Sequence, residues 1–140
     1  MIVTTNGCYD GLHPGHLFLF GYAKALAGDG RFIVGINSDE YIRRKKNRKP
    51  YYLLEQRRTI LYNIGMFDEI YNFDDDTPNE FIRYIKPDIH CIGEEYAPNP
   101  AEKVVCDELG IKLVYVPRIK NLASSQLNNN FIRKFNRLFL

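Results

Sequence analysis

The segment from residue 6 to residue 16 concentrates residues whose types and spacing suit chemistry on a phosphate. It reads NGCYDGLHPGH and carries two histidines three positions apart, around a proline and a glycine. The preceding run, residues 1–5, is apolar and β-branched enough for a buried strand, and Gly7 can turn the chain behind it. Pro14 suits the first position of a helix, so we predict that a helix begins near His13.

A helix that starts directly behind a strand is well suited to bind phosphate. The backbone N–H groups of its first turn are unpaired and carry a partial positive charge. Gly7 and Gly15 would let a ligand approach the backbone closely. His13 and His16 can face the same side of the helix and donate N–H bonds to one phosphoryl group, which stabilises charge that grows in a transition state. For either histidine alone, a role in helix capping or packing is the alternative interpretation.

The elements that must position this segment alternate along the chain. Candidate strands are residues 2–5, 32–37, 69–72, 89–93 and 112–117, and candidate helices are 16–27, 55–64, 79–85 and 101–109. This order predicts an α/β fold with a parallel sheet of about five strands and helices on both faces. In such sheets ligands bind beyond the carboxyl ends of the strands, where the strand order reverses, so the histidine segment lies where the fold favours a ligand.

Size and composition agree with one domain spanning residues 1–140. The chain has 140 residues and is 45% hydrophobic, enough for a sizeable core. Residues 124–140 form a predicted C-terminal helical segment, because apolar side chains recur in it near the helical period. No apolar run approaches the length of a membrane span and no leader-like segment is found, so we expect a cytoplasmic protein without a membrane partner. Cys8, Cys91 and Cys106 show no paired spacing, which indicates buried fillers and argues against a disulfide framework or a zinc site.

The histidine segment resembles a known signature. Residues 7–16 are similar to the Gly-x-Phe-Asp-x-x-His-x-Gly-His motif of the HxGH nucleotidyltransferase family, with Tyr9 in place of phenylalanine. This family includes glycerol-3-phosphate cytidylyltransferase and the adenylyltransferase domain of bacterial heptose-phosphate enzymes. Further matches follow in the same order at residues 37–39, 55–57, 75–78, 117–118 and 122–127. The resemblance implies a single-domain Rossmann-like fold.

The resemblance also implies which residues form the site. The groups expected to act on the phosphates of a nucleoside triphosphate are His13, His16, Lys46 and Arg118. Nucleotide contacts are expected from Gly7, Cys8, Tyr9, Asp10, Gly15, Gly93, Glu95, Ser124 and Ser125. Contacts to the acceptor or to phosphate are expected from Arg44, Lys45 and Arg57. Four of these residues have ordinary alternatives: Asp10 as a turn former, Arg118 in a surface ion pair, and Ser124 and Ser125 as helix caps.

Residues 43–49 form a strongly basic run. Six of these seven residues are Lys or Arg, although the formal net charge of the whole chain is only +2. Such a run is a solvated face, a nucleic-acid patch or a loop that closes over a triphosphate. The resemblance implies a basic loop that contacts phosphates, with Lys46, Arg44 and Lys45 as candidates. No nucleic-acid partner is expected, because the run lacks interleaved aromatic residues.

The reaction implied by the resemblance is the transfer of a nucleoside monophosphate from CTP or ATP to a small phosphorylated polyol or sugar, with release of pyrophosphate. Residues 92–96 and the segment at Arg118 resemble the cytidylyltransferase, which favours CTP slightly. Residues 6–8, 55–57 and 75–78 lean toward the heptose type and keep ATP open. Mg²⁺ would accompany the triphosphate without any certain protein ligand, and a homodimer is implied. The alternatives are a nucleotide-binding module without catalysis and a nucleic-acid or partner-binding protein that uses residues 43–49.

Overall fold

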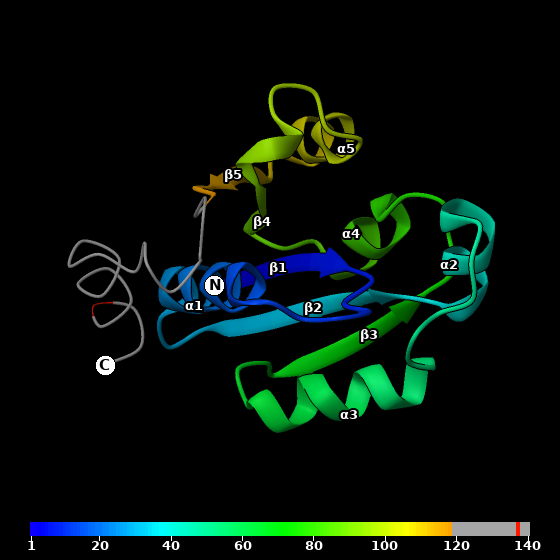
Figure 1. Cartoon of the computed structure of the whole chain (residues 1–140). Coiled ribbons are helices and arrows are strands. Elements are labelled where there is room, and N and C mark those ends of the chain that lie inside the picture. The colour runs from blue at the N-terminus through cyan, green and yellow to red at the C-terminus, as the bar shows by residue number, and fades with distance from the viewer. Residues whose placement is uncertain (119–136, 138–140) are drawn as a thin grey trace.

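Five parallel strands form the centre of the protein, and the helices between them follow the order that the sequence predicts (Figure 1). The computed structural model describes residues 1–118 and residue 137. The elements in chain order are β1 (Ile2–Gly7), α1 (Pro14–Ala27), β2 (Arg31–Asn37), α2 (Asp39–Lys46), α3 (Leu54–Ile64), β3 (Glu69–Phe73), α4 (Asn79–Ile85), β4 (Ile89–Gly93), the 3-10 turn η1 (Glu94–Tyr96), α5 (Glu102–Leu109) and β5 (Lys112–Val116).

The sheet has the strand order β3-β2-β1-β4-β5, so the direction of winding reverses between β1 and β4. β1 pairs with β2 from Ile2 to Gly7, but it pairs with β4 only at Val3 and Thr4. Beyond Thr4 the carboxyl ends of β1 and β4 are therefore no longer joined. A crevice at such a switch point is where ligands bind in open α/β sheets.

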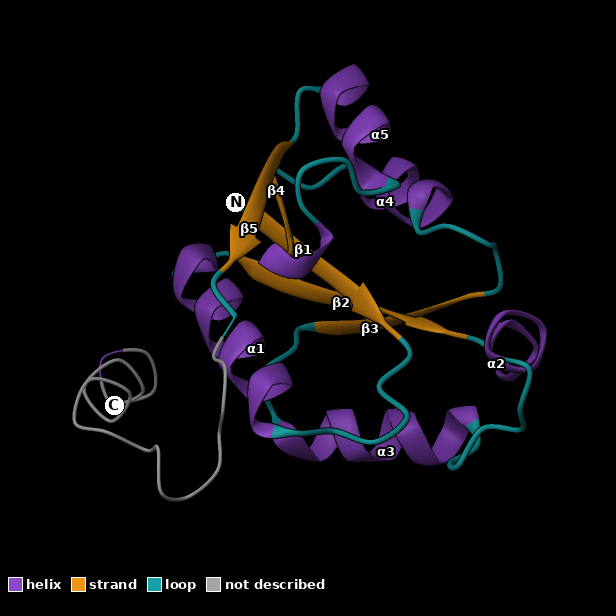
Figure 2. Ribbon diagram, turned by 45° about the horizontal axis from the view of Figure 1, so that its top comes forward, coloured by secondary structure: helices purple, strands orange, loops and turns teal. Residues whose placement is uncertain are grey.

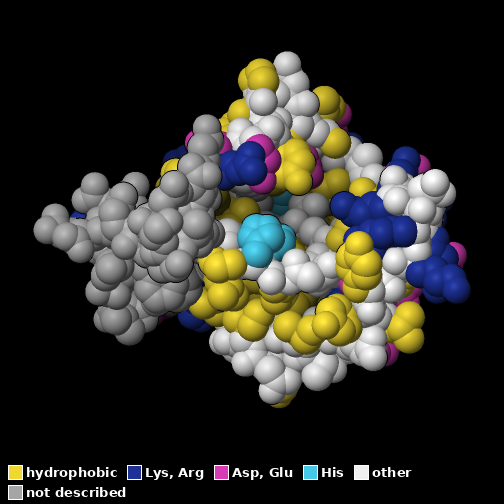
Figure 3. All heavy atoms as spheres, in the orientation of Figure 1, with side chains coloured by type: hydrophobic (Ala, Val, Ile, Leu, Met, Phe, Trp, Pro, Cys, Tyr) yellow, Lys and Arg dark blue, Asp and Glu magenta, His cyan; other side chains and the backbone are white. Residues whose placement is uncertain are grey.

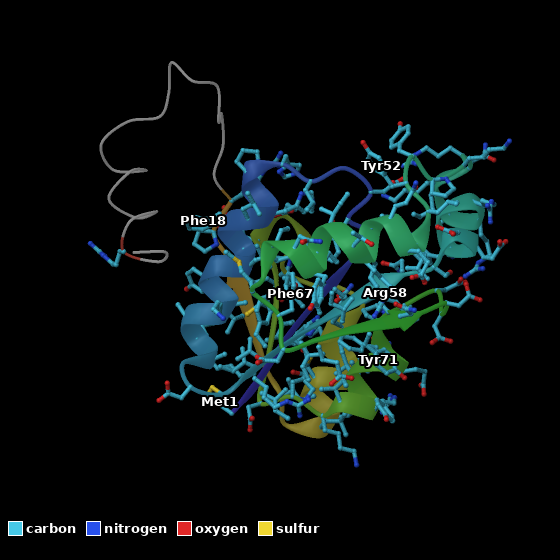
Figure 4. All side chains as sticks on the ribbon, turned by 90° about the horizontal axis from the view of Figure 1, so that it is seen from below. Met1, Phe18, Tyr52, Arg58, Phe67 and Tyr71 are labelled. Atoms are coloured by element: carbon cyan, nitrogen blue, oxygen red, sulfur yellow. The ribbon has the colours of Figure 1, made fainter. Side chains whose placement is uncertain are left out.

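Helices cover both faces of the sheet (Figure 2). α1 and α3 lie on one face, and α4 and α5 pack together on the other. Phe67 belongs to the first layer, where its ring lies 4.9 Å from the ring of Phe20 and 5.1 Å from that of Phe32 (Figure 4). The second layer is built on Phe81 of α4, whose buried ring stacks on Phe73 of β3 with 5.8 Å between the ring centroids. Burial of each such side chain contributes roughly 1.5–3 kcal/mol, which holds the loops at the carboxyl ends of the strands in place.

The predicted fold class is confirmed, and one helix was missed. α2 begins after Ser38, whose hydroxyl accepts a hydrogen bond from the Tyr41 amide at 3.0 Å. The first four residues of the basic run thus form the end of a helix and not the expected loop. The sequence signal was weak, because Ile42 is the only side chain of this short helix that is buried.

The structure also bears on what was expected of the C-terminal segment, of membrane-spanning helices and of the cysteines. Ser124 and Ser125 lie outside the described residues, as does the predicted segment 124–140 except for residue 137. Within the described part of the chain, no helix is long and apolar enough to cross a membrane. Cys91 and Cys106 are buried as expected, whereas Cys8 is only partly buried, which corrects its assignment as a core filler.

Candidate active site

The loop between β1 and α1 is shaped by Tyr9. This residue has a positive φ of 52°, and its buried ring folds back over Gly7. A Cβ atom on Gly7 would lie 2.8 Å from the Tyr9 ring, so glycine is required there. The same ring contacts His16 edge-on, with 5.7 Å between the ring centroids, and packs on Phe20. Tyr9 therefore packs against His16, and its largely buried side chain lines the cavity beside β1.

His13 and His16 are held together at the start of α1. The Nδ1 atom of His13 accepts a hydrogen bond from the Gly15 amide at 3.1 Å, and the Nδ1 atom of His16 accepts one from the His13 amide at 3.1 Å. The two ring centroids are 3.8 Å apart. Because each Nδ1 atom accepts, each neutral ring carries its proton on Nε2 and keeps that N–H as a donor. Burial, and then the neighbouring His13, lower the pKa of His16 to about 4, so this ring is neutral at pH 7.

Gly15 is the residue that lets the His13 ring lie so close to the helix. A Cβ atom at this position would lie 2.8 Å from Cε1 and 2.9 Å from Nδ1 of His13. Its role is thus to make room for an imidazole, and its own amide holds that imidazole in place.

Two cavities meet at the histidines. The β1–α2 cavity, of about 500 Å³, is lined by Asn6, Lys46 and Glu102 among others. The β5 cavity, of about 470 Å³, is lined by His13, Gly15 and Arg118 among others. His16, Leu19, Glu95 and Tyr96 border both. Figure 3 shows the imidazole surface beside a hollow in this face, with Lys and Arg side chains on either side.

Each cavity receives a cation from the predicted set. Lys46, at the end of α2, lines the β1–α2 cavity, and Arg118, behind β5, lines the β5 cavity. The backbone amide of Arg118 donates to Glu94 Oε1 at 2.8 Å, which ties the end of β5 to the turn after β4. The structure thus brings His13, His16, Lys46 and Arg118 to one connected cleft.

Arg57 is not a ligand contact, which corrects the prediction. Its guanidinium is fully buried and donates to the carbonyl oxygens of Cys8, Asn37 and Tyr52 at 2.7–3.0 Å. It also forms an ion pair with Asp39 at 2.7 Å. These four partners lie after β1, at the end of β2, at the start of α2 and before α3. Arg57 therefore joins the loops that surround the β1–α2 cavity.

Arg44 and Lys45 also differ from the prediction. Both pair with Asp76, at 2.9 and 3.1 Å, on the exposed surface between α2 and the loop after β3. Neither side chain is part of the lining of the two cavities. Arg48, which was not assigned a role, lines the β1–α2 cavity and stacks on Tyr51 with 4.0 Å between guanidinium and ring centre.

Asp10 lines the β1–α2 cavity and is also bound by the chain before α3. Its carboxylate accepts hydrogen bonds from Arg48 and from the amides of Tyr51 and Tyr52, each at 2.8 Å, and its side chain is 2% exposed. Burial alone would raise the pKa of Asp10, but these three hydrogen bonds outweigh it and lower the pKa. Asp10 thus joins the first loop to the chain before α3, and its contact to a nucleotide stays a prediction.

The remaining predicted residues lie at the cleft. Gly7 and Cys8 line the β1–α2 cavity, and Gly93 lines the β5 cavity. The carboxylate of Glu95 folds back against Gly93, in a position that any side chain there would occupy. Glu102, which sequence analysis missed, is partly buried in the β1–α2 cavity, and burial raises its pKa. Its only sequence signal is its place at the start of a helix that follows a strand end.

No group of three or more His, Cys, Asp or Glu side chains within residues 1–118 is arranged to hold a metal ion. Asp10, the carboxylate nearest in sequence to the histidines, already has three donors. The donor set therefore does not fit a metal held chiefly by protein side chains.

Comparisons with known proteins agree with this geometry. The family model described as cytidylyltransferase-like matches residues 4–136. The bifunctional protein HldE of Marinomonas sp. is 45% identical over 96 residues, and that of Caulobacter vibrioides is 34% identical over 133 residues. These alignments cover 68% and 94% of this chain but only 20% and 26% of the relatives.

Solved structures show the same fold. A lipopolysaccharide core biosynthesis protein from Thermoplasma volcanium superposes with a TM-score of 0.68 at 24% identity, covering 86% of this chain and 98% of that one. Pantothenate synthetase from Thermus thermophilus superposes with a TM-score of 0.61 at 15% identity, covering 95% of this chain and 64% of that one. The chain belongs to the cytidylyltransferase-like family, as the histidine segment behind its first strand predicts.

Proposed function

We propose that this chain is a nucleotidyltransferase that moves a nucleoside monophosphate from a nucleoside triphosphate to the phosphate of a small phosphorylated sugar or polyol. The observation that carries this proposal is the histidine pair. Each Nδ1 atom is occupied by a backbone amide, so two Nε2–H donors are left at the start of α1, beside a cleft. Fixed neutral donors of this kind favour an anion that gains charge during reaction.

The reaction is an in-line displacement. An oxygen of the acceptor phosphate forms a bond to the α-phosphorus of the triphosphate, and the bond from that phosphorus to the pyrophosphate oxygen breaks. The acceptor phosphate is mostly dianionic at neutral pH, because its second pKa is near 6, so no strong general base is needed. The protein has to align the two reactants and stabilise the leaving pyrophosphate.

The two cavities suit the two reactants. We place the triphosphate across His13 and His16 into the β5 cavity, where Arg118 supplies positive charge. We place the acceptor in the β1–α2 cavity, where Lys46 would meet its phosphate and Glu102 could accept hydrogen bonds from its hydroxyl groups. In this arrangement His16, which borders both cavities, lies beside the phosphorus that is transferred.

Magnesium belongs to the substrate in this proposal. When bound with the triphosphate it supplies charge neutralisation, and phosphate oxygens and waters would hold it. This matches the donor set described above, in which no cluster of protein ligands is found among residues 1–118.

The test is a pyrophosphate-release screen of CTP and ATP against a panel of sugar and polyol phosphates, with Mg²⁺. We propose CTP as the donor, on the residues 92–96 and Arg118, and ATP runs beside it as the alternative. The matched control is His16→Ala, for which we expect a loss in turnover of about 100-fold or more, equivalent to about 2.7 kcal/mol. A loss below about threefold would contradict the assigned role.

The two other classes of function have less support. A module that only binds nucleotide would not need two fixed imidazole donors, and it would bind CTP or ATP without releasing pyrophosphate. A nucleic-acid binder would use the basic run, but Arg43, Arg44, Lys45 and Arg48 are already paired with carboxylates. Binding of DNA or RNA that falls steeply with salt would favour that alternative.

A further inference from the structure

His90 is a third histidine, and the reaction proposed above does not use it. It lies in β4 and is fully buried. Its Nδ1 atom lies 2.7 Å from Thr4 Oγ1, and its Nε2 atom lies 2.9 Å from Asn6 Oδ1. Thr4 and Asn6 point to the same face of the sheet, because they are two residues apart on β1. The imidazole thus bridges two side chains of β1 just where the backbone pairing with β4 stops.

The direction of both hydrogen bonds follows from the partners. Burial lowers the pKa of His90 to about 3, so the ring is neutral and has one donor and one acceptor. Asn6 Oδ1 can only accept, so Nε2 carries the proton. Nδ1 then accepts from the hydroxyl of Thr4, and both ring nitrogens are satisfied.

This arrangement leaves the other half of the Asn6 carboxamide free. Asn6 is partly buried and lines the β1–α2 cavity. Its Nδ2 atom has no hydrogen-bond partner within the described chain. This atom is also not fully enclosed: among the described residues, Asn79 Oδ1 is the only side-chain atom that is both fully buried and unpaired. Two N–H donors of Asn6 are therefore open to the cavity.

The orientation of the Asn6 carboxamide decides whether it attracts or repels a phosphate in the cavity. A carboxamide that is free to flip presents its oxygen as readily as its nitrogen, and a carbonyl oxygen repels a phosphate oxygen. The cavity is lined by two cations, Lys46 and Arg48, but also by the carboxylates of Asp76, Glu95 and Glu102, so a phosphate there needs donors directed at its oxygens. An amide locked with its nitrogen outward supplies two neutral donors of this kind.

We propose that His90 is a positioning residue, which together with Thr4 locks the carboxamide of Asn6 so that its N–H groups bind a phosphate oxygen of the acceptor. The proposal rests on the function proposed above for the identity of the ligand. The donor direction of Asn6 and its dependence on His90 rest on the geometry alone.

The first test does not require turnover. The side-chain amide signals of Asn6, identified by their loss in Asn6→Ala, are followed by ¹H–¹⁵N NMR while inorganic phosphate or pyrophosphate is added. We expect the signals to shift in the native protein and to stop responding in His90→Phe. Signals that stay in place in the native protein would overturn the proposal, even if the protein releases pyrophosphate; signals that shift would support it, even if no donor and acceptor pair reacts.

The second test is a double-mutant cycle on kcat/KM for the acceptor. His90→Phe should lower it about 10–100-fold, because a misdirected donor misplaces the substrate. His90→Gln, which returns an N–H near the Nε2 position, should recover most of that loss. In the Asn6→Ala background, His90→Phe should lower kcat/KM for the acceptor less than about threefold. Losses that multiply would refute a role through Asn6. If His90→Phe does not fold, Thr4→Val takes its place in the cycle with the same criterion.

Discussion

Substitution of Gly15 by alanine should separate activity from stability. The new Cβ atom would lie 2.8 Å from Cε1 of His13, whereas ordinary contacts begin at 3.4 Å, so the ring must move by about 0.6 Å. The movement also breaks the hydrogen bond from the Gly15 amide to Nδ1 of His13. Since a displacement of about 1 Å at a reacting centre costs up to 100-fold, we expect kcat to fall about 10–100-fold, or about 1.4–2.7 kcal/mol.

The folded state should not suffer, because the clash is with a side chain that can rotate away. Alanine is favoured over glycine in a helix interior by up to about 1 kcal/mol, whereas loss of the N-cap hydrogen bond of His13 costs about 0.5–2 kcal/mol. The two effects largely offset each other, so the thermal midpoint should change by no more than about 3 °C. The assays are continuous pyrophosphate release and thermal unfolding. Ala25→Gly, at an exposed position of α1, is the matched control: it should lower the midpoint by about 3 °C and leave kcat unchanged. A Gly15→Ala protein with kcat within threefold of the native value would refute the reasoning.

Three further outcomes follow from the same contacts. Arg57→Met removes a buried guanidinium with four partners and leaves Asp39 unpaired. The free energy of unfolding, measured by denaturant titration, should therefore drop by about 3–5 kcal/mol. A drop below about 1 kcal/mol would show that Arg57 does not hold these loops together. Asp10→Asn should cost about 1.5–3 kcal/mol at pH 7. Because the pKa of Asp10 is lowered in the folded state, its contribution to the free energy of unfolding is present above about pH 3.9 and is lost as the pH falls through the folded pKa. The difference in unfolding free energy between Asp10→Asn and the native protein should therefore shrink in acid. A difference that is constant from pH 7 to pH 3 would disprove this. Lys46→Ala should raise KM for the acceptor about tenfold with little change for the nucleotide, and the reverse pattern would exchange the two cavities.

Local signals were enough to predict the fold and to place the histidine segment behind the first strand. The strand, the glycine turn and the proline before His16 lie within residues 1–16, and each acts through its own backbone preferences or those of its neighbours. The five strands were predicted because apolar runs alternate with helical periods, a pattern that leaves little choice of topology. Strand order then places the first loop at the switch point without further information.

The contacts that sequence analysis did not foresee join segments that are distant along the chain. Arg57 in a sequence looks like any surface arginine, and only the folded chain shows that carbonyl oxygens of the loop after β1 and of the end of β2 face it. Asp10 is bound by the loop before α3, which lies more than forty positions away. His90 stands in an apolar strand, and its partners on β1 are 84 and 86 residues distant.

The central claim is that His16 is a neutral donor through Nε2 at the pH of the reaction. The most direct measurement is the ¹⁵N NMR titration of the His16 ring, with and without pyrophosphate. The account predicts a proton on Nε2, an unprotonated Nδ1, a pKa of about 4 and a shift of the Nε2–H signal when pyrophosphate binds. A ring that titrates near 6.5, carries its proton on Nδ1 or ignores pyrophosphate would contradict it.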